Sequence, residues 1–426
     1  MTQELINVGL APNDRSGDSW RDAMIKTNNN FTELYGQFGN NIYIVNAESE
    51  FPNQDNSFIY LDDLSLYQIG SPFSHSKSIV SLGGTLIGMG TASTPELTYL
   101  GSGAQFIANS NNIRISNISI SAPNGSIFSV SGTAPRSNTL VIGDIFVLGA
   151  QSMGTITNIQ AAVFNNSSFF VDDGFTFSGP GSVVVAFSEI AFGNLLNGSI
   201  AIDLGSLVTD EVELNNVIVS TDFGNNAGVV ALSGLANSGN IPTGNKATVN
   251  NSNFVGLTTP LQNITVDDIR WEFMNSRPVP NSSKAADTFL LNTEVVTISA
   301  SGTFVAVGGS NWESDVATRF TASAAGVLTY IGEEDANFLI IAVSTIEKVG
   351  GGSDFIETRI SINGVTTGNS FIKTGSATDN NNPTSVTSQG IFTLSENDTV
   401  QVYVANNDST SNVIVDRSNL TIINGF

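Results

Sequence analysis

The chain has 426 residues, enough for two or three domains, and a formal net charge of −23 at pH 7. This charge disfavours nucleic acid or an anionic membrane surface as a partner. The sequence has no cysteine and one histidine, which excludes disulfides, thiolate metal sites, histidine-based catalytic triads and clustered-histidine zinc sites. Its 41 glycines, with many Asn and Ser residues, are typical of all-β structure with many turns.

Residues 1–41 differ from the rest of the chain and predict an amphipathic helix that begins near Ser19. A largely apolar seam follows, with steps that alternate between four and three residues: Trp20, Met24, Thr27, Phe31 and Leu34. So short a seam does not hold as an isolated helix in water, and it therefore needs partner helices or a docking surface. A helix folded back on its own domain is the alternative.

The stretch INVGLAPNDRSGDSWRDAMIKTNNNFTELYG (6–36) closely resembles the N-terminal motif of many phage tail fibre and structural proteins. It departs from that motif at Arg15, where Gly is usual, and at Trp20, where a smaller residue is usual. The resemblance implies a virion-attachment segment that docks on phage tail or baseplate proteins. It agrees with the docking partner that the seam requires.

Residues 42–112 predict the entry to a stacked β-structure, with several short alternating strands. The string GGTLIGMG (83–90) is followed by no Lys-Ser/Thr pair and no helix pattern, which argues against a phosphate-binding loop. Its glycines fit coil corners instead. His75, in SPFSHSKS, is expected in a loop.

Seven six-residue segments between 115 and 271 repeat one design, with apolar residues first and last and a polar residue third. The third positions are Asn117, Asp144, Asn166, Glu189, Asn216, Asn251 and Asp268, and the first four intervals are 27, 22, 23 and 27 residues. Equal strands at a nearly fixed period predict a solenoid, here a right-handed parallel β-helix over 42–274. Asn and Asp tolerate the left-handed backbone of a corner, so these residues should stack in a column. Sandwich strands that alternate by chance are the alternative.

The last two intervals, 35 and 17 residues, strain this pattern. A Gly/Ser/Asn/Pro stretch at 231–246 predicts a loop inserted into one coil. The two intervals add up to two coils of ordinary length, so the match near Asn251 is expected to lie out of register, within a doubtful region at 231–268.

Residues 275–287 have the Pro, Ser and charged composition of a linker, and residues 288–426 show about eight or more strands. This count and length predict a two-sheet jelly-roll head domain. The segments FTASAAGVLTYIG, SENDTVQVYVANND and SNLTIINGF resemble the trimeric jelly rolls of the tumour-necrosis-factor and complement-head type, which implies a homotrimer. Asn397 stands where that family commonly has Gly.

Several carboxylates are candidates for glycan cleavage, which needs two carboxyls roughly 5–9.5 Å apart. Glu211 and Glu213 alternate on one strand face, about 7 Å apart, and Glu189, Glu272 and the pair Asp172–Asp173 could join them across coils. Acidic residues are abundant everywhere, however, so a polar surface is the favoured interpretation. The basic residues within 106–271 are Arg114, Arg136, Lys246 and Arg270, which leaves little to bind a uronic-acid substrate in a lyase site.

Aromatic residues and acidic loops give similar expectations. A group of phenylalanines is assigned to the solenoid core, while Trp271 and Trp312 are the better candidates for exposed platforms, although a structural role is favoured for each. The group is Phe169, Phe170, Phe175, Phe177 and Phe187. Loops at 332–338, 378–383 and 406–412 could bind calcium, but none has the spacing of a known calcium motif, so no metal and no cofactor are predicted.

The favoured hypothesis is an all-β phage tail fibre or spike subunit: a short helical anchor, a parallel β-helix and a jelly-roll head, assembled as a homotrimer. The head would bind a host-surface receptor, glycan or protein, through unassigned loops of 288–426, without catalysis. A polysaccharide depolymerase and a purely structural virion decoration or connector are the alternatives. No apolar run reaches the roughly 18 residues that span a bilayer, and the N-terminus lacks a basic signal-peptide start. The expected location is the virion, after synthesis in the host cytoplasm without membrane insertion.

Overall fold

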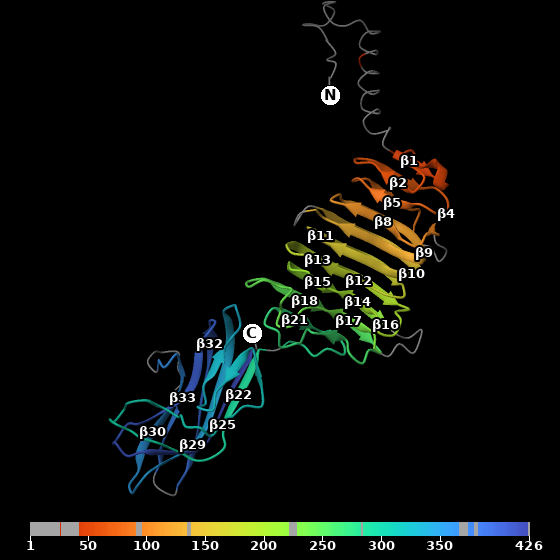
Figure 1. The fold of residues 1–426 in the computed structure, drawn as a ribbon. Coiled ribbons are helices and arrows are strands. Elements are labelled where there is room, and N and C mark those ends of the chain that lie inside the picture. Colours follow the sequence, from red (N-terminus) through yellow and green to blue (C-terminus); the bar gives the residue numbers. More distant parts are fainter. Residues whose placement is uncertain are drawn as a thin grey trace, which may run out of the picture. The chain divides into compact units, whose positions relative to one another are not determined.

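The computed structural model describes residues 26, 42–90, 96–133, 138–220, 228–282, 284–365, 374–378 and 382–424 (Figure 1). The predicted seam residues Trp20, Met24, Phe31 and Leu34 lie outside these ranges, so the attachment helix stays a prediction. The chain divides into two compact units, Met1–Thr265 with Glu272–Pro280, and Val266–Trp271 with Asn281–Phe426. Within the described ranges no helix is long and apolar enough to cross a membrane.

The first unit is a parallel β-solenoid of about nine turns, which confirms the solenoid prediction. Its strands form one 21-stranded sheet whose coils stack from β1 to β21 (Figure 1). The pairings define three faces. Face A contains β1 (Ile42–Val45), β3 (Leu66–Ile69), β6 (Thr85–Ile87), β9 (Ile113–Ser131), β10 (Thr139–Thr157), β11 (Ala161–Phe170), β13 (Ser182–Gly193), β15 (Thr209–Asn215), β18 (Lys246–Asn250) and β21 (Trp271–Met274).

The other two faces share the long strands β9 and β10, which run through the corners. Face B adds β4 (Phe73–His75), β7 (Leu97–Tyr99), β16 (Ile218–Ser220) and β19 (Asn253–Val255), and includes the ends of β11 and β13. Face C adds β2 (Phe58–Leu61), β5 (Ser78–Ser81), β8 (Ala104–Asn109), β12 (Phe175–Ser178), β14 (Ile200–Asp203), β17 (Val230–Ser233) and β20 (Leu261–Gln262). A short 3-10 helix, η1 (Glu48–Glu50), follows β1.

The predicted corner column is present, because six of its seven members have the left-handed backbone. Their φ angles lie between 43° and 57°, at Asn117, Asp144, Asn166, Glu189, Asn216 and Asn251. Side chains of the column bond between coils: Asn166 Nδ2 donates to Asp144 Oδ1 at 2.6 Å. The left-handed turn at each corner redirects the strand while its neighbours remain paired, so one polar residue per coil determines where the chain bends.

The prediction for the seventh member, Asp268, was wrong, and so was the expected register error at Asn251. Asn250 pairs with Asn215 in the regular ladder, whereas the next corner is Asn275, with φ 50°, instead of Asp268. Asn275 Nδ2 donates to Asn251 Oδ1 at 3.4 Å. The carbonyl of Asp268 accepts the N–H of Trp271, so Asp268 lies in a turn before β21. The inserted loop lengthens the coil before Asn251 and the coil after it is of ordinary length.

Glu189 is the one column member that is neither Asn nor Asp, and its φ is 57°. A left-handed conformation costs an ordinary side chain about 1–2 kcal/mol, and Asn tolerates it better. Glu189→Asn should therefore raise the free energy of unfolding by roughly 1 kcal/mol in urea titrations. Glu213→Asn, in the strand β15, should give no such gain. Equal midpoints for Glu189→Asn and the parent chain would contradict the strain assigned to this corner.

The solenoid interior is filled with stacked aromatic rings, as predicted for Phe169, Phe175, Phe177 and Phe187, all of which are fully buried. The rings of Phe164 and Phe187 stack at 4.6 Å with an interplanar angle of 10°. Identical inward positions on successive coils bring such rings into register. Phe170 is the exception in the predicted group, because it is only half-buried and contacts Phe146 on the outer side of face B at 5.4 Å.

His75 was expected in a loop, but it ends strand β4 and is 1% exposed. Its Nδ1 lies 2.8 Å from the carbonyl of Lys77, and its Nε2 lies 3.1 Å from Gln105 Nε2. The neutral ring satisfies both contacts when Nδ1–H donates and Nε2 accepts. Burial lowers the pKa of His75, which favours this neutral form. The residue is a structural part of the core.

The second unit is an antiparallel β-sandwich. Its seven-stranded sheet contains β22 (Ala285–Leu290), β23 (Glu294–Val296), β25 (Trp312–Glu313), β26 (Ala317–Thr318), β29 (Ala336–Lys348), β32 (Thr384–Leu394) and β34 (Val413–Asn424). The six-stranded sheet contains β24 (Val305–Ala306), β27 (Phe320–Ala322), β28 (Leu328–Tyr330), β30 (Asp354–Ile362), β31 (Thr374–Thr378) and β33 (Thr399–Asn406). Apolar residues of both sheets, among them Phe320, Tyr330 and Phe338, form one core.

Two details of the sandwich differ from or refine the sequence expectations. Strand β22 begins at Ala285, inside the predicted linker 275–287. Asn397 has φ 70° in the turn between β32 and β33, where its N–H donates to the carbonyl of Tyr330 at 2.8 Å. Asn can replace Gly at such a position because it tolerates the left-handed conformation.

Candidate functional site

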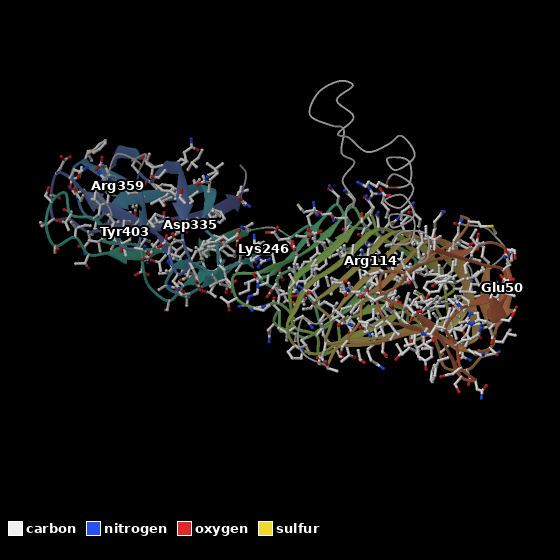
Figure 2. All side chains as sticks on the ribbon, turned by 90° about the horizontal axis from the view of Figure 1, so that it is seen from above. Glu50, Arg114, Lys246, Asp335, Arg359 and Tyr403 are labelled. Atoms are coloured by element: carbon white, nitrogen blue, oxygen red, sulfur yellow. The ribbon has the colours of Figure 1, made fainter. Side chains whose placement is uncertain are left out.

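The predicted carboxylates Glu211, Glu213 and Glu272 gather on the outer side of face A around Lys246. Glu211 pairs with Lys246 across β15 and β18, and Lys246 Nζ lies 3.1 Å from Glu272 Oε1. Figure 2 shows Lys246 on the solenoid. Burial, followed by the charge of Glu213 and a hydrogen bond with it, raises the pKa of Glu211. The structure therefore brings three of the four candidate glutamates into one charged cluster.

Glu189 does not join this cluster. It lies in the corner column, three residues beyond Ala186, which is the residue that pairs with Glu213. Three residues along a strand span roughly 10 Å. Glu211 is exposed on an open sheet face, and a lysine offsets part of the local negative charge. Exposed ion pairs of this kind are common and contribute little to stability, so we interpret the cluster as solvated side chains around a lysine and not as an enclosed acid–base pair.

Both tryptophans are buried, which agrees with the structural role favoured for them and not with the alternative of exposed platforms. Trp271 is 0% exposed, and Trp312 is 3% exposed within the sandwich core. Trp312 Nε1 donates to the carbonyl of Gly308 at 3.1 Å. A flat indole buries a large apolar area once its N–H finds a partner, which explains why it lies inside the sandwich.

Internal bonds hold acidic side chains in two of the three candidate calcium loops, 332–338 and 406–412, whereas residues 379–381 of the third lie outside the described ranges. Lys348 Nζ lies 3.0 Å from Asp354 Oδ1, and both side chains are nearly buried. Asn406 Nδ2 donates to Asp354 Oδ2 at 2.9 Å, and Asp408 Oδ2 accepts the N–H of Phe355 at 2.7 Å. In the loop at 332–338, Glu333 pairs with Arg270 at 2.7 Å. Nowhere in the described part of the chain do three or more Asp, Glu, His or Cys side chains gather as a metal site would require.

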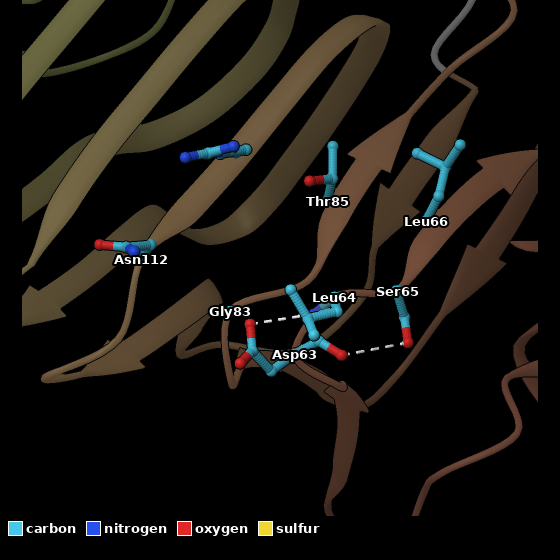
Figure 3. A pocket seen from close by; sticks show the side chains of 8 residues that line it. Asp63, Leu64, Ser65, Leu66, Gly83, Thr85 and Asn112 are labelled. Atoms are coloured by element: carbon cyan, nitrogen blue, oxygen red, sulfur yellow. Dashed lines mark hydrogen bonds between the residues drawn. The ribbon is translucent and has the colours of Figure 1, made fainter. Parts of the chain in front are cut away.

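A pocket on the outer side of face A was missed by sequence reasoning. It has a volume of about 380 Å³ and is lined by residues of three successive coils: Asp63, Leu64, Ser65, Leu66, Gly83, Thr85, Asn112 and Arg114 (Figure 3). The lining residues are separated by up to 51 positions in the sequence, and only the coil register brings them together. The one available signal was Arg114, a basic residue in an acidic solenoid.

No protein-family model and no curated protein matches the chain. Among solved structures, it is similar to the Eiger tumour necrosis factor of S. frugiperda, at 12% identity and a TM-score of 0.25, over 34% of this chain and 93% of that one. It is also similar to bacteriophage CBA120 tailspike protein 4, enzymatically active domain, at 10% identity and a TM-score of 0.19, over 90% of this chain and 63% of that one. A third similarity is to the Dettilon tailspike protein, at 10% identity and a TM-score of 0.17, over 88% and 87% of the two chains.

Proposed function

We propose that the chain is a subunit of a phage tail spike or tail fibre that attaches the particle to a host-surface receptor without cleaving it. The observation that carries the proposal is the union of a parallel solenoid with a separate antiparallel sandwich, behind an N-terminal segment that resembles a virion-attachment motif. Hydrogen bonds join each coil to the next, which gives a stiff body suited to holding a binding module away from a particle.

The assembled form in this proposal is a homotrimer. The sandwich is taken as a jelly roll of the tumour-necrosis-factor type, on the sequence segments that resemble that family, and the anchor docks on tail or baseplate proteins. Three weak receptor sites on one trimer, multiplied over several fibres, convert weak contacts into firm adsorption. The receptor is a glycan or a protein of the host surface.

The charged cluster on face A favours binding over cleavage but keeps a depolymerase as the second candidate. The raised pKa of Glu211 and its hydrogen bond with Glu213 are the observation in favour of an acid–base pair. Against it, Glu211 is exposed on an open face and Lys246 accompanies the acids. If the chain were an enzyme, purified protein would shorten host capsule or lipopolysaccharide, and Glu211→Gln or Glu213→Gln would abolish this.

Adsorption competition tests the proposal. The purified full chain should bind bacterial cells that carry the receptor and should block adsorption of particles that display it. Native mass spectrometry of the same preparation should show a trimer. A monomer at micromolar concentration would contradict the multivalent mechanism, and a trimer that binds no cells would favour a structural decoration or connector.

A further inference from the structure

A row of three outward side chains from successive coils lines the pocket on face A. Leu66, Thr85 and Arg114 occupy equivalent outward positions on β3, β6 and β9, since Leu66 pairs with Thr85 and Thr85 with Arg114. Adjacent strands lie about 4.8 Å apart, so these side chains form a continuous row. The volume of the pocket, about 380 Å³, falls in the range of small-ligand sites.

Arg114 is exposed and has no ion pair or side-chain hydrogen bond with any part of the chain that the structure describes. Two lysines of the solenoid are engaged: Lys77 Nζ donates to Gln54 Oε1 at 2.7 Å and lies 3.7 Å from Glu48, and Lys246 pairs with Glu272. In a chain of net charge −23 an unpaired guanidinium inside a pocket is unexpected. It suits an anionic ligand, above all a planar carboxylate.

Neutral hydrogen-bonding groups surround the guanidinium. Asn112 Oδ1 accepts from Thr139 N at 2.8 Å and from Thr139 Oγ1 at 3.0 Å, which fixes its amide. Its Nδ2 and the hydroxyl of Thr85 have no partner among the residues described. Figure 3 shows Asn112 and Thr85 at the pocket, with Asp63 at its other side. Such groups are the usual partners of sugar hydroxyls.

Leu64 is strained and exposed at the same pocket. Its φ is 60°, and it is 83% exposed. Of the positive-φ residues other than glycine that the structure describes, Leu64, Glu189 and Arg319 alone are not Asn, Asp or Ser. Stability alone would select Asn or Gly here, so the exposed leucine points to another use. Gly83 also has positive φ, and a side chain there would meet Asp63 Oδ1 at 2.5 Å.

We propose that this pocket binds a hexuronate unit of a glycan. Arg114 takes the carboxylate as a bidentate pair, Asn112 and Thr85 bind ring hydroxyls, and Leu64 covers an apolar ring face. The negative charge of Asp63 disfavours a dianion such as a phosphate ester, and its carboxylate can accept a hydrogen bond from a sugar hydroxyl. A single cation suffices to bind one carboxylate and requires no lyase chemistry. The inference deepens the proposed receptor binding and rests on it for its biological meaning, but it locates a glycan contact on the solenoid.

Binding is tested on the full chain with four probes: a hexuronate oligosaccharide, glucuronate, its neutral counterpart glucose, and glucose 6-sulfate, an anion without a carboxylate. Saturation-transfer NMR and calorimetry should detect the two hexuronates and not glucose, with affinity that falls as salt is raised. Arg114→Gln should weaken binding of the oligosaccharide about tenfold or more. Arg277→Gln, at an exposed arginine of the same unit, should leave the affinity for the oligosaccharide unchanged.

Leu64→Asn separates a binding role from a structural one. Relief of the left-handed strain should raise the unfolding midpoint, while loss of the apolar contact should lower the affinity for the oligosaccharide. The proposal is overturned if hexuronates do not bind, if Arg114→Gln binds like the parent chain, or if glucose 6-sulfate binds better than glucuronate. These tests can fail separately from adsorption competition. A chain that blocks particle adsorption but binds no hexuronate would contradict the hexuronate site and leave the proposed receptor binding intact.

Discussion

Gly154→Ala should strongly destabilise the middle of the solenoid. Gly154 has φ +99°, and a methyl group there would collide with the carbonyl oxygen of Phe128 in the preceding coil. The residue pairs with Phe128 on one side and Phe175 on the other, and those two rings stack across it at 6.3 Å with an interplanar angle of 16°. We expect a loss of about 3 kcal/mol or more in the free energy of unfolding, measured by urea titration.

Two other glycines supply matched controls for this collision. Gly198 has φ +85° but open space around its missing side chain, so Gly198→Ala carries backbone strain alone, about 1–2 kcal/mol. Gly143 has neither a positive φ nor a neighbour within 4 Å, so Gly143→Ala should change stability little. If Gly154→Ala were no more harmful than Gly198→Ala, the close approach of the coils would not be what demands glycine.

Asp354→Ala should strongly destabilise the sandwich. Asp354 is 8% exposed and accepts hydrogen bonds from Lys348, Asn406 and Ser409, while Asn406 Nδ2 also donates to the carbonyl of Ser411. Removal of one member of a buried pair leaves the other charge uncompensated, and the expected cost is about 3–5 kcal/mol in thermal or urea unfolding. These bonds join the β29–β30 connection to the β33–β34 connection, so both should loosen.

Asp408→Ala provides the control, because Asp408 accepts the backbone N–H of Phe355 in β30 and forms no ion pair among the described contacts. Its loss should cost about 1 kcal/mol. The double variant Lys348→Met with Asp354→Leu should recover much of the loss, since apolar replacement of both charges removes the desolvation cost. A double variant as unstable as Asp354→Ala would show that the hydrogen bonds, and not the charge pair, dominate.

The same carboxylate should make the sandwich sensitive to acid. Burial raises the pKa of Asp354, but hydrogen bonds from Ser409, Asn406 and Lys348 outweigh it, so the pKa lies below its ordinary value of 3.8. The unfolded chain then binds more protons, so the stabilising contribution is present above pH 3.8 and is lost as pH falls through the folded pKa. Asp354→Asn should flatten this part of the stability curve.

Local sequence patterns predicted much of the fold because the solenoid repeats a local rule. Alternation of inward and outward residues and a left-handed polar corner are properties of a few neighbouring residues, and they located six of the corners correctly. The prediction for Asp268 was wrong because its segment has the same apolar and polar order but forms a turn before β21. Pattern alone cannot separate a turn that precedes a strand from a corner inside one.

The side chains that matter for chemistry were predicted less well, for a different reason. The sequence favoured a structural role for Trp271 and Trp312 but left exposed platforms open, and only the packing from other strands decided that both are buried. His75 looked like a loop residue among serines, yet its partner Gln105 lies 30 positions away. The carboxylates Glu211 and Glu213 were located on one strand face, but the lysine beside them comes from the next coil.

Three features could be predicted from the amino-acid pattern: the chain is all-β, it contains a parallel solenoid with polar corners, and a second region of strands follows. Those features follow from spacing between neighbours along the chain. The register between successive coils emerges only in the folded molecule, and it is this register that brings Arg114 beside Leu64 and Asn112 in a pocket. The physical reason is that coil lengths vary from 22 to 35 residues between corners, so contacts across coils depend on a register that no local pattern states.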